Sequence, residues 1–513
     1  MMRFSVLLFS LLYTTMVSAA TAAAGDNRPL LHYTPEKGWM NDPNGLFYDK
    51  KADLWHIYFQ YNPHDPFWNQ PLYWGHATSK DLTTWNHEKL AISPDRDDEG
   101  IFSGSIVIDH NNTSGFFDDS IDPDQRVVAI YTNNADIQTQ DLAYSLDGGY
   151  TFTKFHNNPV LDVNSTQFRD PKVFWHQHSN QWIMVVVKSQ EYKVQIFGSP
   201  DLKNWKFHSN FTAGYPGFQF ECPGLIEIPI TGTNESKWVM FIAINPGSPV
   251  GGSTNQYFIG DFDGVEFKPI DHFTRFVDLG KDYYALQTFS DVEKADGVLA
   301  IAWASNWQYA NNVPTKEWRS SLSLTRNFSL DYVAANPESK LLTLIQTPVF
   351  QTDVAKTLEK KNITLSANDS IDFEADSGVF EFELKFKAIN ALAHSDLANL
   401  DLYISSADGK ESIRFGYDPV GQSFYLDRSN TPYKNPYFTG QLSAYVEPSS
   451  DGQYKIYGVV DRNIIELYFN DGVTAMTNTF FMSEGNTPSR AQLKTNFDDE
   501  FYIESISFNE LSV

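Results

Sequence analysis

Short apolar runs rich in Val, Ile, Phe, Tyr and Trp recur along the chain, separated by polar stretches that carry Gly, Pro, Asn and Asp. The three-to-four-residue spacing of apolar positions that indicates amphipathic helices is scarce. Runs of this kind, bounded by turn-forming residues, are typical of β-strands. The pattern therefore predicts an all-β protein.

A polar turn followed by an aromatic residue recurs at a regular spacing. Three clear copies and a looser fourth one occupy residues 79–85, 145–152, 199–205 and 263–267. Their aspartates, Asp81, Asp147, Asp201 and Asp263, are 54 to 66 residues apart. Because Asp and Gly favour tight turns, each copy predicts a hairpin between two outer strands.

A second repeat places a polar residue just before an apolar strand. Its copies begin at Asp42, Ser103, Asp170 and Glu221, 51 to 67 residues apart, and a degenerate copy covers residues 283–288. A further apolar strand follows each copy. Two interleaved repeats of about 60 residues, each with about four strands, indicate a β-propeller with insertions. We predict five blades over residues 27–335.

The repeats stop after residue 335. Residues 336–361 carry no blade signature and are predicted to be a linker. Farther on, Phe380, Phe382, Leu384 and Phe386 alternate with charged residues. Because many strands with one apolar and one polar face are typical of two packed antiparallel sheets, we predict a β-sandwich over residues 362–513.

The N-terminus has the features of a secretory signal peptide over residues 1–22. Arg3 precedes an apolar run of about 14 residues, and small residues follow. No later apolar stretch reaches the roughly 20 residues that span a membrane. Glycosylation triplets of the type Asn-x-Ser/Thr begin at Asn111, Asn112, Asn164, Asn210, Asn234, Asn327, Asn362 and Asn368. We therefore expect a secreted, N-glycosylated protein that is not bound to a membrane. The single cysteine, Cys222, excludes an intrachain disulfide.

Composition narrows the range of partners. The chain has 38 Lys and Arg against 64 Asp and Glu, a net charge of −26, which disfavours binding to nucleic acids and anionic membranes. Aromatic residues make up 15% of the chain. Their flat apolar faces suit neutral ligands such as sugars.

Three acidic residues of the second repeat indicate the chemistry. The inner strands of a propeller line its axis, so equivalent positions, here those of Asp42, Asp170 and Glu221, converge there. Like charges in one pocket are costly. Glycoside hydrolysis uses such a cluster because it needs one ionised and one protonated carboxyl group. Arg169 is a cation that we expect to keep Asp170 charged.

Other chemistries lack their motifs. The 12 His form no His-Glu-x-x-His pair, and the acidic turn at residues 95–99 lacks the spacing of a calcium loop. The glycines of residues 245–252 fit no phosphate-binding pattern, and no Gly-x-Ser-x-Gly elbow is present. We therefore predict neither a metal nor a cofactor.

Several motifs resemble those of glycoside hydrolase family 32, the family of the invertases and β-fructofuranosidases. They are Trp-Met-Asn-Asp-Pro-Asn-Gly (39–45), Phe-Gln-Tyr-Asn-Pro (59–63), Trp-Gly-His (74–76), Phe-Ser-Gly (102–104), Phe-Arg-Asp-Pro (168–171), Glu-Cys-Pro-Gly (221–224), Trp-Ala-Ser-Asn-Trp (303–307), Trp-Arg-Ser (318–320), Asp-Arg-Asn (461–463) and Glu-Leu-Tyr-Phe-Asn (466–470). The resemblance covers nearly the whole mature chain and is strongest to the secreted yeast invertases. It independently implies a five-bladed propeller followed by a β-sandwich.

The resemblance also implies roles for individual residues. Asp42 would be the nucleophile at the anomeric carbon of a fructosyl unit, Glu221 the acid and base, and Asp170 the stabiliser of the transition state. The residues implied to bind sucrose or fructo-oligosaccharides are Trp39, Met40, Asn41, Gln60, Trp68, Phe102, Ser103, Arg169 and Trp307, with Gln167, Gln219 and Asn245 toward the leaving sugar. The implied activity is hydrolysis of terminal β-D-fructofuranosides, chiefly sucrose, with retention of configuration and with fructosyl transfer to sugars as a side reaction.

Two alternatives stay open at this point. The first is a fructosyltransferase, or a hydrolase of inulin or levan, on the same fold. The second is a catalytically silent sugar-binding protein whose sandwich acts as a lectin. The sandwich itself has three open roles: to hold the propeller rigid, to bind polymer, or to form a homodimer or larger homo-oligomer. Cys222, beside Glu221, is interpreted as a buried, inert thiol.

Overall fold

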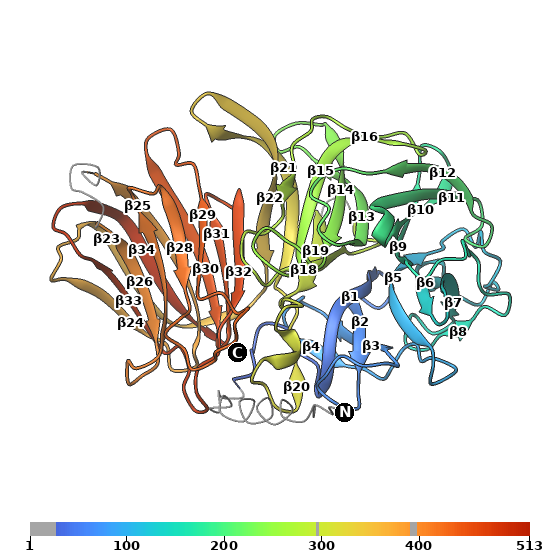
Figure 1. Ribbon diagram of the computed structural model, residues 1–513, viewed down its shortest axis with the longest axis horizontal. Coiled ribbons are helices and arrows are strands. Elements are labelled where there is room, and N and C mark those ends of the chain that lie inside the picture. The colour runs from blue at the N-terminus through green and yellow to red at the C-terminus, as the bar shows by residue number, and fades with distance from the viewer. Residues whose placement is uncertain (1–26, 294–296, 390–397) are drawn as a thin grey trace, which may run out of the picture.

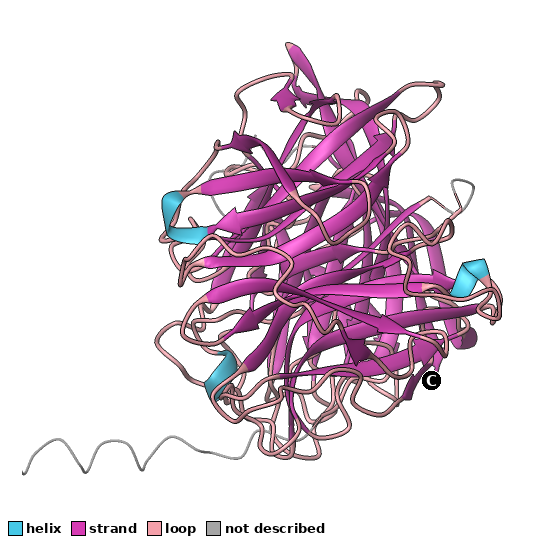
Figure 2. Ribbon diagram, turned by 90° about the vertical axis from the view of Figure 1, so that its right-hand side faces the viewer, coloured by secondary structure: helices cyan, strands magenta, loops and turns pink. Residues whose placement is uncertain are grey.

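The computed structural model describes residues 27–293, 297–389 and 398–513, and it consists almost wholly of β-strands. Figure 1 shows two parts, an N-terminal group of sheets (blue to yellow) and a C-terminal pair of sheets (orange to red). In the described residues the helices are single turns on connections, η1 (Pro123–Gln125), η2 (Ser189–Glu191) and η4 (Ala310–Asn312), as Figure 2 also shows. The all-β prediction is confirmed. The predicted signal peptide, residues 1–22, lies outside the described residues.

The N-terminal domain contains five sheets that follow one another along the chain. The first comprises β1 (Gly38–Asp49), β2 (Leu54–Asn62), β3 (Tyr73–Ser79) and β4 (Trp85–His87), with β20 (Trp318–Arg319) parallel to β1. The second comprises β5 (Gly100–Ile108), β6 (Val127–Asn134), β7 (Gln138–Ser145) and β8 (Thr153–Lys154). The third comprises β9 (Phe168–His176), β10 (Gln181–Lys188), β11 (Lys193–Ser199) and β12 (Lys206–Phe211).

Of the last two sheets of this domain, the fifth, which contains β21 and β22, lies beside the sandwich in Figure 1. The fourth comprises β13 (Phe220–Pro229), β14 (Ser236–Ile244), β15 (Thr254–Phe262), β16 (Phe267–Pro269) and β17 (Arg275–Phe276). The fifth comprises β18 (Tyr284–Thr288), β19 (Val298–Trp303), β21 (Thr325–Asn336) and β22 (Ser339–Val349).

The first strands of the five sheets form a closed ring. Strands β1, β5, β9, β13 and β18 contact one another in this order, and β18 contacts β1. Each sheet therefore extends outward from a common axis, as the blades of a propeller do. The number and order of the sheets are those that the two repeats predict.

The repeated turns lie between the third and fourth strands of their sheets, as predicted. In the first copy the Asp81 carboxylate accepts the backbone N–H groups of Thr83 at 2.9 Å and Thr84 at 2.7 Å. Asp147, Asp201 and Asp263 accept N–H groups in the same way. The aspartate thus closes each turn by satisfying backbone donors that no strand partner reaches.

The predicted linker at residues 336–361 is wrong. Most of this stretch belongs to two strands, β22 and β23 (Asp353–Thr364), and the chain passes between the domains over residues 350–352. Leu342 and Leu344 of β22 are buried, whereas β23 is an edge strand with almost every side chain exposed. Because an exposed edge strand has no apolar face, its sequence carries no alternating pattern by which to recognise it.

The C-terminal domain is a β-sandwich of two six-stranded sheets, which confirms that prediction. One sheet comprises β23, β34 (Phe501–Ser512), β25 (Val379–Ala388), β30 (Gln453–Asp461), β31 (Ile464–Phe469) and β32 (Thr474–Thr479). The other comprises β24 (Ser370–Glu374), β33 (Arg490–Thr495), β26 (Leu400–Ser405), β27 (Ser412–Asp418), β28 (Ser423–Asp427) and β29 (Gln441–Tyr445). The alternating residues Phe380, Phe382, Leu384 and Phe386 all lie in the core between the sheets.

Buried ion pairs join the two domains. Arg326 of β21 contacts Asp278 at 3.0 Å and Glu466 of the sandwich at 2.8 Å. His32 lies between Asp461 at 2.9 Å and Glu466 at 3.2 Å, and both carboxylates are buried with it. A buried charge loses its hydration, so a charge left without a partner at such a position would cost several kcal/mol. The members of these ion pairs therefore hold one another in place.

His32 makes the stability of this contact depend on pH. Burial alone would lower its pKa, but the hydrogen bonds and charges of Asp461 and Glu466 outweigh burial and raise the pKa from 6.5 to about 9. A raised pKa in the folded state contributes stability that is complete below about pH 6.5 and is lost as the pH rises through 9. The shift corresponds to about 3 kcal/mol.

We therefore expect the melting temperature to fall between pH 6.5 and pH 9 more steeply for the native protein than for His32→Gln. Thermal melts monitored by circular dichroism across this range measure the difference. His156→Gln, at an exposed histidine, is the matched control and should melt like the native protein. Parallel curves for the native protein and His32→Gln would contradict the assignment.

Candidate active site

A cavity of about 360 Å³ lies where the inner strands begin, at one end of the ring axis. It is lined by Asn41, Asp42, Gln60, Trp68, Leu72, Phe102, Ser103, Arg169, Asp170, Glu221, Asn245, Trp307 and Asn311. The three carboxylates singled out in the sequence thus meet in one cavity. They come from three different sheets, on β1, β9 and β13.

A β-bulge at the start of each inner strand explains how these residues reach the axis. In every one of the five sheets two residues of the inner strand oppose a single residue of the second strand. The bulged pairs are 41–42, 102–103, 170–171, 222–223 and 285–286. A bulge bends its strand and re-aims the side chains beside it.

The bulges correct one part of the sequence analysis. Asp42, Asp170 and Glu221 do not occupy equivalent positions of the repeat: Glu221 precedes its bulge, Asp170 is the first bulged residue and Asp42 the second. The structural equivalent of Glu221 in the third sheet is Arg169. The sequence alignment took the polar residue before each apolar strand as the equivalent position, and because the bulge falls at a different distance from that residue in each sheet, the register was shifted by one or two residues.

Asp42 is 9% exposed and is held by short polar contacts. Its Oδ2 accepts a hydrogen bond from Ser103 Oγ at 2.7 Å, and its Oδ1 accepts one from Asn41 Nδ2 at 3.0 Å. Burial raises the pKa of Asp42, while these two hydrogen bonds lower it in part. The contacts fix the direction in which the carboxylate points and favour its ionised form.

The pKa of Asp170 is strongly raised. Burial raises its pKa from 3.8 to about 7, and the charges of Glu221 and Asp42 add to the rise, although Arg169 opposes it. Arg169 therefore favours the charged form of Asp170, which is the expected direction, but burial outweighs its effect. Arg169 Nε lies 3.9 Å from Asp170 Oδ2, whereas its Nη2 lies only 3.0 Å from Glu221 Oε1.

Glu221 is held by three donors. Arg169 Nη2 donates to Oε1 at 3.0 Å, Gln219 Nε2 donates to the same oxygen at 3.1 Å, and the Tyr284 hydroxyl donates to Oε2. Its side chain is 15% exposed, more than that of Asp170 at 5%. Glu221 therefore has a fixed orientation together with access to the cavity, which a group that exchanges protons with a ligand requires.

Cys222 connects two of the carboxylates. Its backbone N–H donates to Asp170 Oδ2 at 3.0 Å, and its Sγ lies 3.5 Å from Asp42 Oδ2 and 3.7 Å from Asp170 Oδ2. Burial and the surrounding carboxylates raise the pKa of the thiol well above its usual value, so it stays protonated. The thiol is buried, as expected, but it is also a weak donor to both aspartates.

Four residues assigned to sugar binding from the sequence do not line the cavity. Trp39 and Met40 are fully buried, and Trp39 Nε1 donates to Asn41 Oδ1 at 2.8 Å from behind. Gln167 accepts a hydrogen bond from Arg169 at 2.7 Å, and Gln219 donates to Glu221. These four side chains lie behind the cavity, where they contact lining residues or pack in the core. Only some of the side chains at the start of each inner strand point into the cavity.

One lining residue has an unused polar atom. Gln60 is 1% exposed, its Nε2 donates to Ile101 O at 3.0 Å, and its Oε1 has no hydrogen-bond partner. A buried amide oxygen without a partner costs free energy unless a ligand supplies a donor. A hydroxyl-bearing ligand in the cavity would supply one.

Comparison with known proteins identifies the family. Residues 32–348 match the N-terminal domain of glycosyl hydrolases family 32, and residues 341–510 match the C-terminal domain of the same family. The chain belongs to glycoside hydrolase family 32. This confirms the resemblance on which the sequence analysis relied.

Relatives match this family 32 chain over nearly its whole length. An invertase of Debaryomyces hansenii is 57% identical over 100% of both chains, and an extracellular exo-inulinase of Meyerozyma guilliermondii is 55% identical over 93% of this chain and 94% of the relative. A solved β-fructofuranosidase of Schwanniomyces occidentalis, complexed with fructosyl-erythritol, is 59% identical with a TM-score of 0.93, over 97% of this chain and 99% of the other.

Sequence reasoning missed three residues at the site. Tyr284 lies in the degenerate fifth copy of the second repeat, where no acidic residue drew attention to the position. Leu72 and Asn311 lie on connections outside any repeat, so no periodic signal marked them. Asn311 accepts the backbone N–H of Trp68 at 3.0 Å and so fixes the cavity rim.

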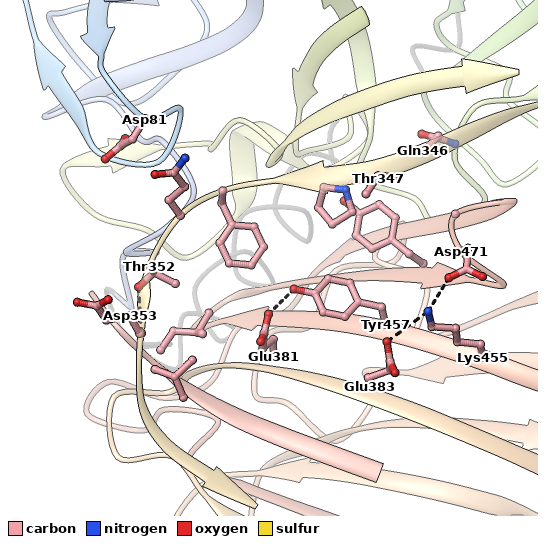
Figure 3. Close-up of a pocket in the computed structure, with 17 residues that line it drawn as sticks. Asp81, Gln346, Thr347, Thr352, Asp353, Glu381, Glu383, Lys455, Tyr457 and Asp471 are labelled. Atoms are coloured by element: carbon pink, nitrogen blue, oxygen red, sulfur yellow. Dashed lines mark hydrogen bonds and ion pairs between the residues drawn. The ribbon is translucent and has the colours of Figure 1, made fainter. Parts of the chain in front are cut away.

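A larger cavity, of about 890 Å³, lies between the domains of the family 32 chain (Figure 3). Its acidic side chains are largely partnered: Tyr457 donates to Glu381, and Lys455 lies 3.4 Å from Glu383 and 2.6 Å from Asp471. Size alone therefore does not mark the functional site.

In the described ranges, no cluster of three or more His, Cys, Asp or Glu is arranged to hold a metal ion. None of the helices in that part of the chain is long and apolar enough to cross a membrane.

The contact from Tyr284 predicts an effect on activity. Removing the hydroxyl in Tyr284→Phe should lower kcat/KM on the order of tenfold, because the Glu221 carboxylate then loses one of the three donors that fix its orientation. Initial rates measure this effect.

Tyr58→Phe is the matched control for this variant. Its hydroxyl is equally buried and donates to Gly149 O at 2.7 Å, away from the cavity. We expect Tyr58→Phe to lower the melting temperature and to keep the native kcat/KM. A native kcat/KM in Tyr284→Phe would refute a role for this hydroxyl.

Proposed function

We propose that the protein is a retaining β-fructofuranosidase that releases terminal non-reducing β-D-fructofuranosyl units, chiefly from sucrose. The observation that carries this proposal is the meeting of three carboxylates with different partners in one cavity of about 360 Å³. Family membership and relatives named as invertases support it. The unpartnered Gln60 oxygen suits a polyhydroxylated ligand.

In the first step, Asp42 attacks the anomeric C2 of the fructosyl unit. A C2–O bond forms to the Asp42 carboxylate, and the bond from C2 to the glycosidic oxygen breaks. Glu221 donates its proton to the departing oxygen, so glucose leaves as a neutral alcohol. Ser103 and Asn41 donate hydrogen bonds that orient the Asp42 carboxylate for this attack and offset in part the effect of burial on its ionisation.

In the second step, water hydrolyses the fructosyl-enzyme ester. Glu221, now ionised, takes a proton from water as the oxygen attacks C2, and Asp42 leaves as a carboxylate. Asp170 binds the fructose hydroxyls and stabilises the positive charge that develops on the ring. Two displacements at C2 give net retention. A sugar hydroxyl in place of water would give fructosyl transfer through the same intermediate.

Fructo-oligosaccharides are the second class of substrate that we propose. An exo-inulinase is among the relatives, and a variant of the Schwanniomyces enzyme has been solved with fructosylnystose. Trp68, which lines the cavity, is 39% exposed and offers an apolar face outside the pocket. Such a face suits further sugar rings of a longer chain.

Incubation of the purified protein with sucrose, inulin and levan, with the products resolved by chromatography, tests this function. We expect fructose and glucose from sucrose, and loss of at least about 1,000-fold in turnover for Asp42→Asn and Glu221→Gln. Asp81→Asn, the same change in an outer turn, should keep native activity. Transfer products in excess of free fructose would identify a fructosyltransferase, and absence of turnover would indicate a sugar-binding protein.

A nucleophile other than sugar or water tests retention. With methanol added, the fructosyl intermediate should give methyl β-D-fructofuranoside, because the second displacement restores the original configuration. Nuclear magnetic resonance distinguishes the anomers. The α anomer would refute the two-step mechanism.

We also propose that the protein is secreted and N-glycosylated, since extracellular relatives support export. Association into a homodimer or larger homo-oligomer through the sandwich stays a prediction. The acceptors with exposed side chains are Asn111, Asn164, Asn210, Asn234, Asn362 and Asn368. In contrast, the Nδ2 of Asn112, the atom to which a glycan attaches, donates to Phe117 O at 2.7 Å.

We expect glycans at exposed acceptors and none at Asn112. Enzymatic deglycosylation in water labelled with a heavy isotope of oxygen converts each glycosylated Asn to a labelled Asp. Peptide mass spectrometry then identifies each position from its mass shift. A glycan at Asn112 would contradict the geometry of that turn.

A further inference from the structure

The sandwich contacts the active-site loops through one buried arginine. Arg428, directly after β28, is 1% exposed, and its guanidinium lies 3.6 Å above the ring of Phe438. Within the sandwich it donates to Thr439 O at 2.9 Å and to Thr479 O at 2.7 Å. Its remaining contacts cross into the N-terminal domain.

Across the boundary Arg428 contacts two residues that also contact each other. Its Nη1 lies 2.9 Å from Asp282 Oδ2, and its Nη2 donates to the Tyr309 hydroxyl at 3.3 Å. That hydroxyl in turn donates to Asp282 Oδ1. All three side chains are buried, so the triangle excludes water, and the loss of one member would leave a buried charge without its full set of partners.

Both partners lie next to the active site along the chain. Asp282 lies two residues before Tyr284, whose hydroxyl donates a hydrogen bond to Glu221. Tyr309 belongs to the loop of residues 305–312, which carries the cavity-lining Trp307 and Asn311. The triangle therefore joins the sandwich to two separate walls of the cavity.

Further contacts fix this loop to the same region. Asn306 Nδ2 donates to Lys281 O at 2.8 Å, and Lys281 Nζ donates to Tyr437 O at 2.7 Å and to Thr439 Oγ1 at 2.8 Å in the sandwich. On its other side the loop rests on the core of the ring, where the ring centroids of Trp307 and Trp39 are 5.7 Å apart.

We propose that Arg428 of the β-sandwich is a positioning residue of the active site, which acts through Asp282 and Tyr309 to hold Trp307, Asn311 and Tyr284 in place. This inference rests on the proposed function of the cavity. It gives the sandwich a role in catalysis within a single subunit. Loosening of the wall weakens sugar binding in the ground state and the transition state alike, which raises KM more than it lowers kcat.

Kinetics of Tyr309→Phe and Arg428→Met on sucrose test the proposal. We expect KM to rise about five- to tenfold with kcat within about threefold of native, because binding is lost uniformly. The control is Asp461→Asn, at a buried domain contact where the carboxylate accepts the N–H groups of Leu30 at 2.8 Å and His32 at 3.0 Å, two residues that lie outside the loop of residues 305–312. It should lower the melting temperature and leave KM within about twofold of native.

The outcomes separate positioning from general stabilisation. A raised KM in both test variants, but not in Asp461→Asn at a similar melting temperature, supports the proposal. Native KM values in the test variants, with lowered melting temperatures only, overturn it. If Arg428→Met does not fold, Tyr309→Phe, which lacks only one hydroxyl, decides alone. Asp42→Asn is assayed in the same series: if it retains activity, the proposed site is wrong, independently of the result for Arg428.

Discussion

The bulge at the start of each inner strand is the feature on which the site depends. A regular strand would direct successive side chains to opposite faces of its sheet, so that at most every second residue could face the axis. With two residues set against one, neighbouring positions such as Asn41 and Asp42 both line the cavity. The bulge of the second sheet likewise places both Phe102 and Ser103 in the cavity, and the left-handed backbone of Asp170, with φ of 65°, lies at the bulge of the third sheet.

Concentrating three carboxylates in this way requires a different environment for each of them. Asp42 accepts from two side-chain donors, Asp170 accepts a backbone N–H but is buried with a raised pKa, and Glu221 faces Arg169 and remains the more accessible. The arginine thus lies against Glu221 and only distantly against Asp170. Arg169, which lies near Asp170 and Glu221, and the thiol of Cys222, which contacts both aspartates, link the three groups in one network.

The sequence predicts features that have a period and misses those that do not. The turn repeat and the strand repeat gave the five sheets because each copy serves the same local purpose, as Asp81 shows by closing its turn on the N–H groups of Thr83 and Thr84. The three carboxylates were identified for the same reason, although their register was shifted because the sequence does not mark where a bulge falls. Strand β23 was missed because it is exposed on both faces. The supporting positions of Trp39 and Met40 were also missed, since residue type does not reveal which side of a strand a side chain occupies.

The domain boundary is where the repeats carry least information and where the structure adds most. Arg326 is buried with Glu466, Arg428 with Asp282 and His32 with Asp461, each across the domain boundary, and none of these pairs is close in sequence. Two apolar surfaces can shift relative to one another with little change in free energy, because apolar contacts are not directional. In a buried ion pair, by contrast, the electrostatic attraction weakens markedly when the charges move apart by a few ångströms. A polar contact of this kind fixes the sandwich in a single orientation on the ring. Because Asp282 and Tyr309 lie within a few residues of cavity groups, that orientation also determines where the walls of the cavity stand.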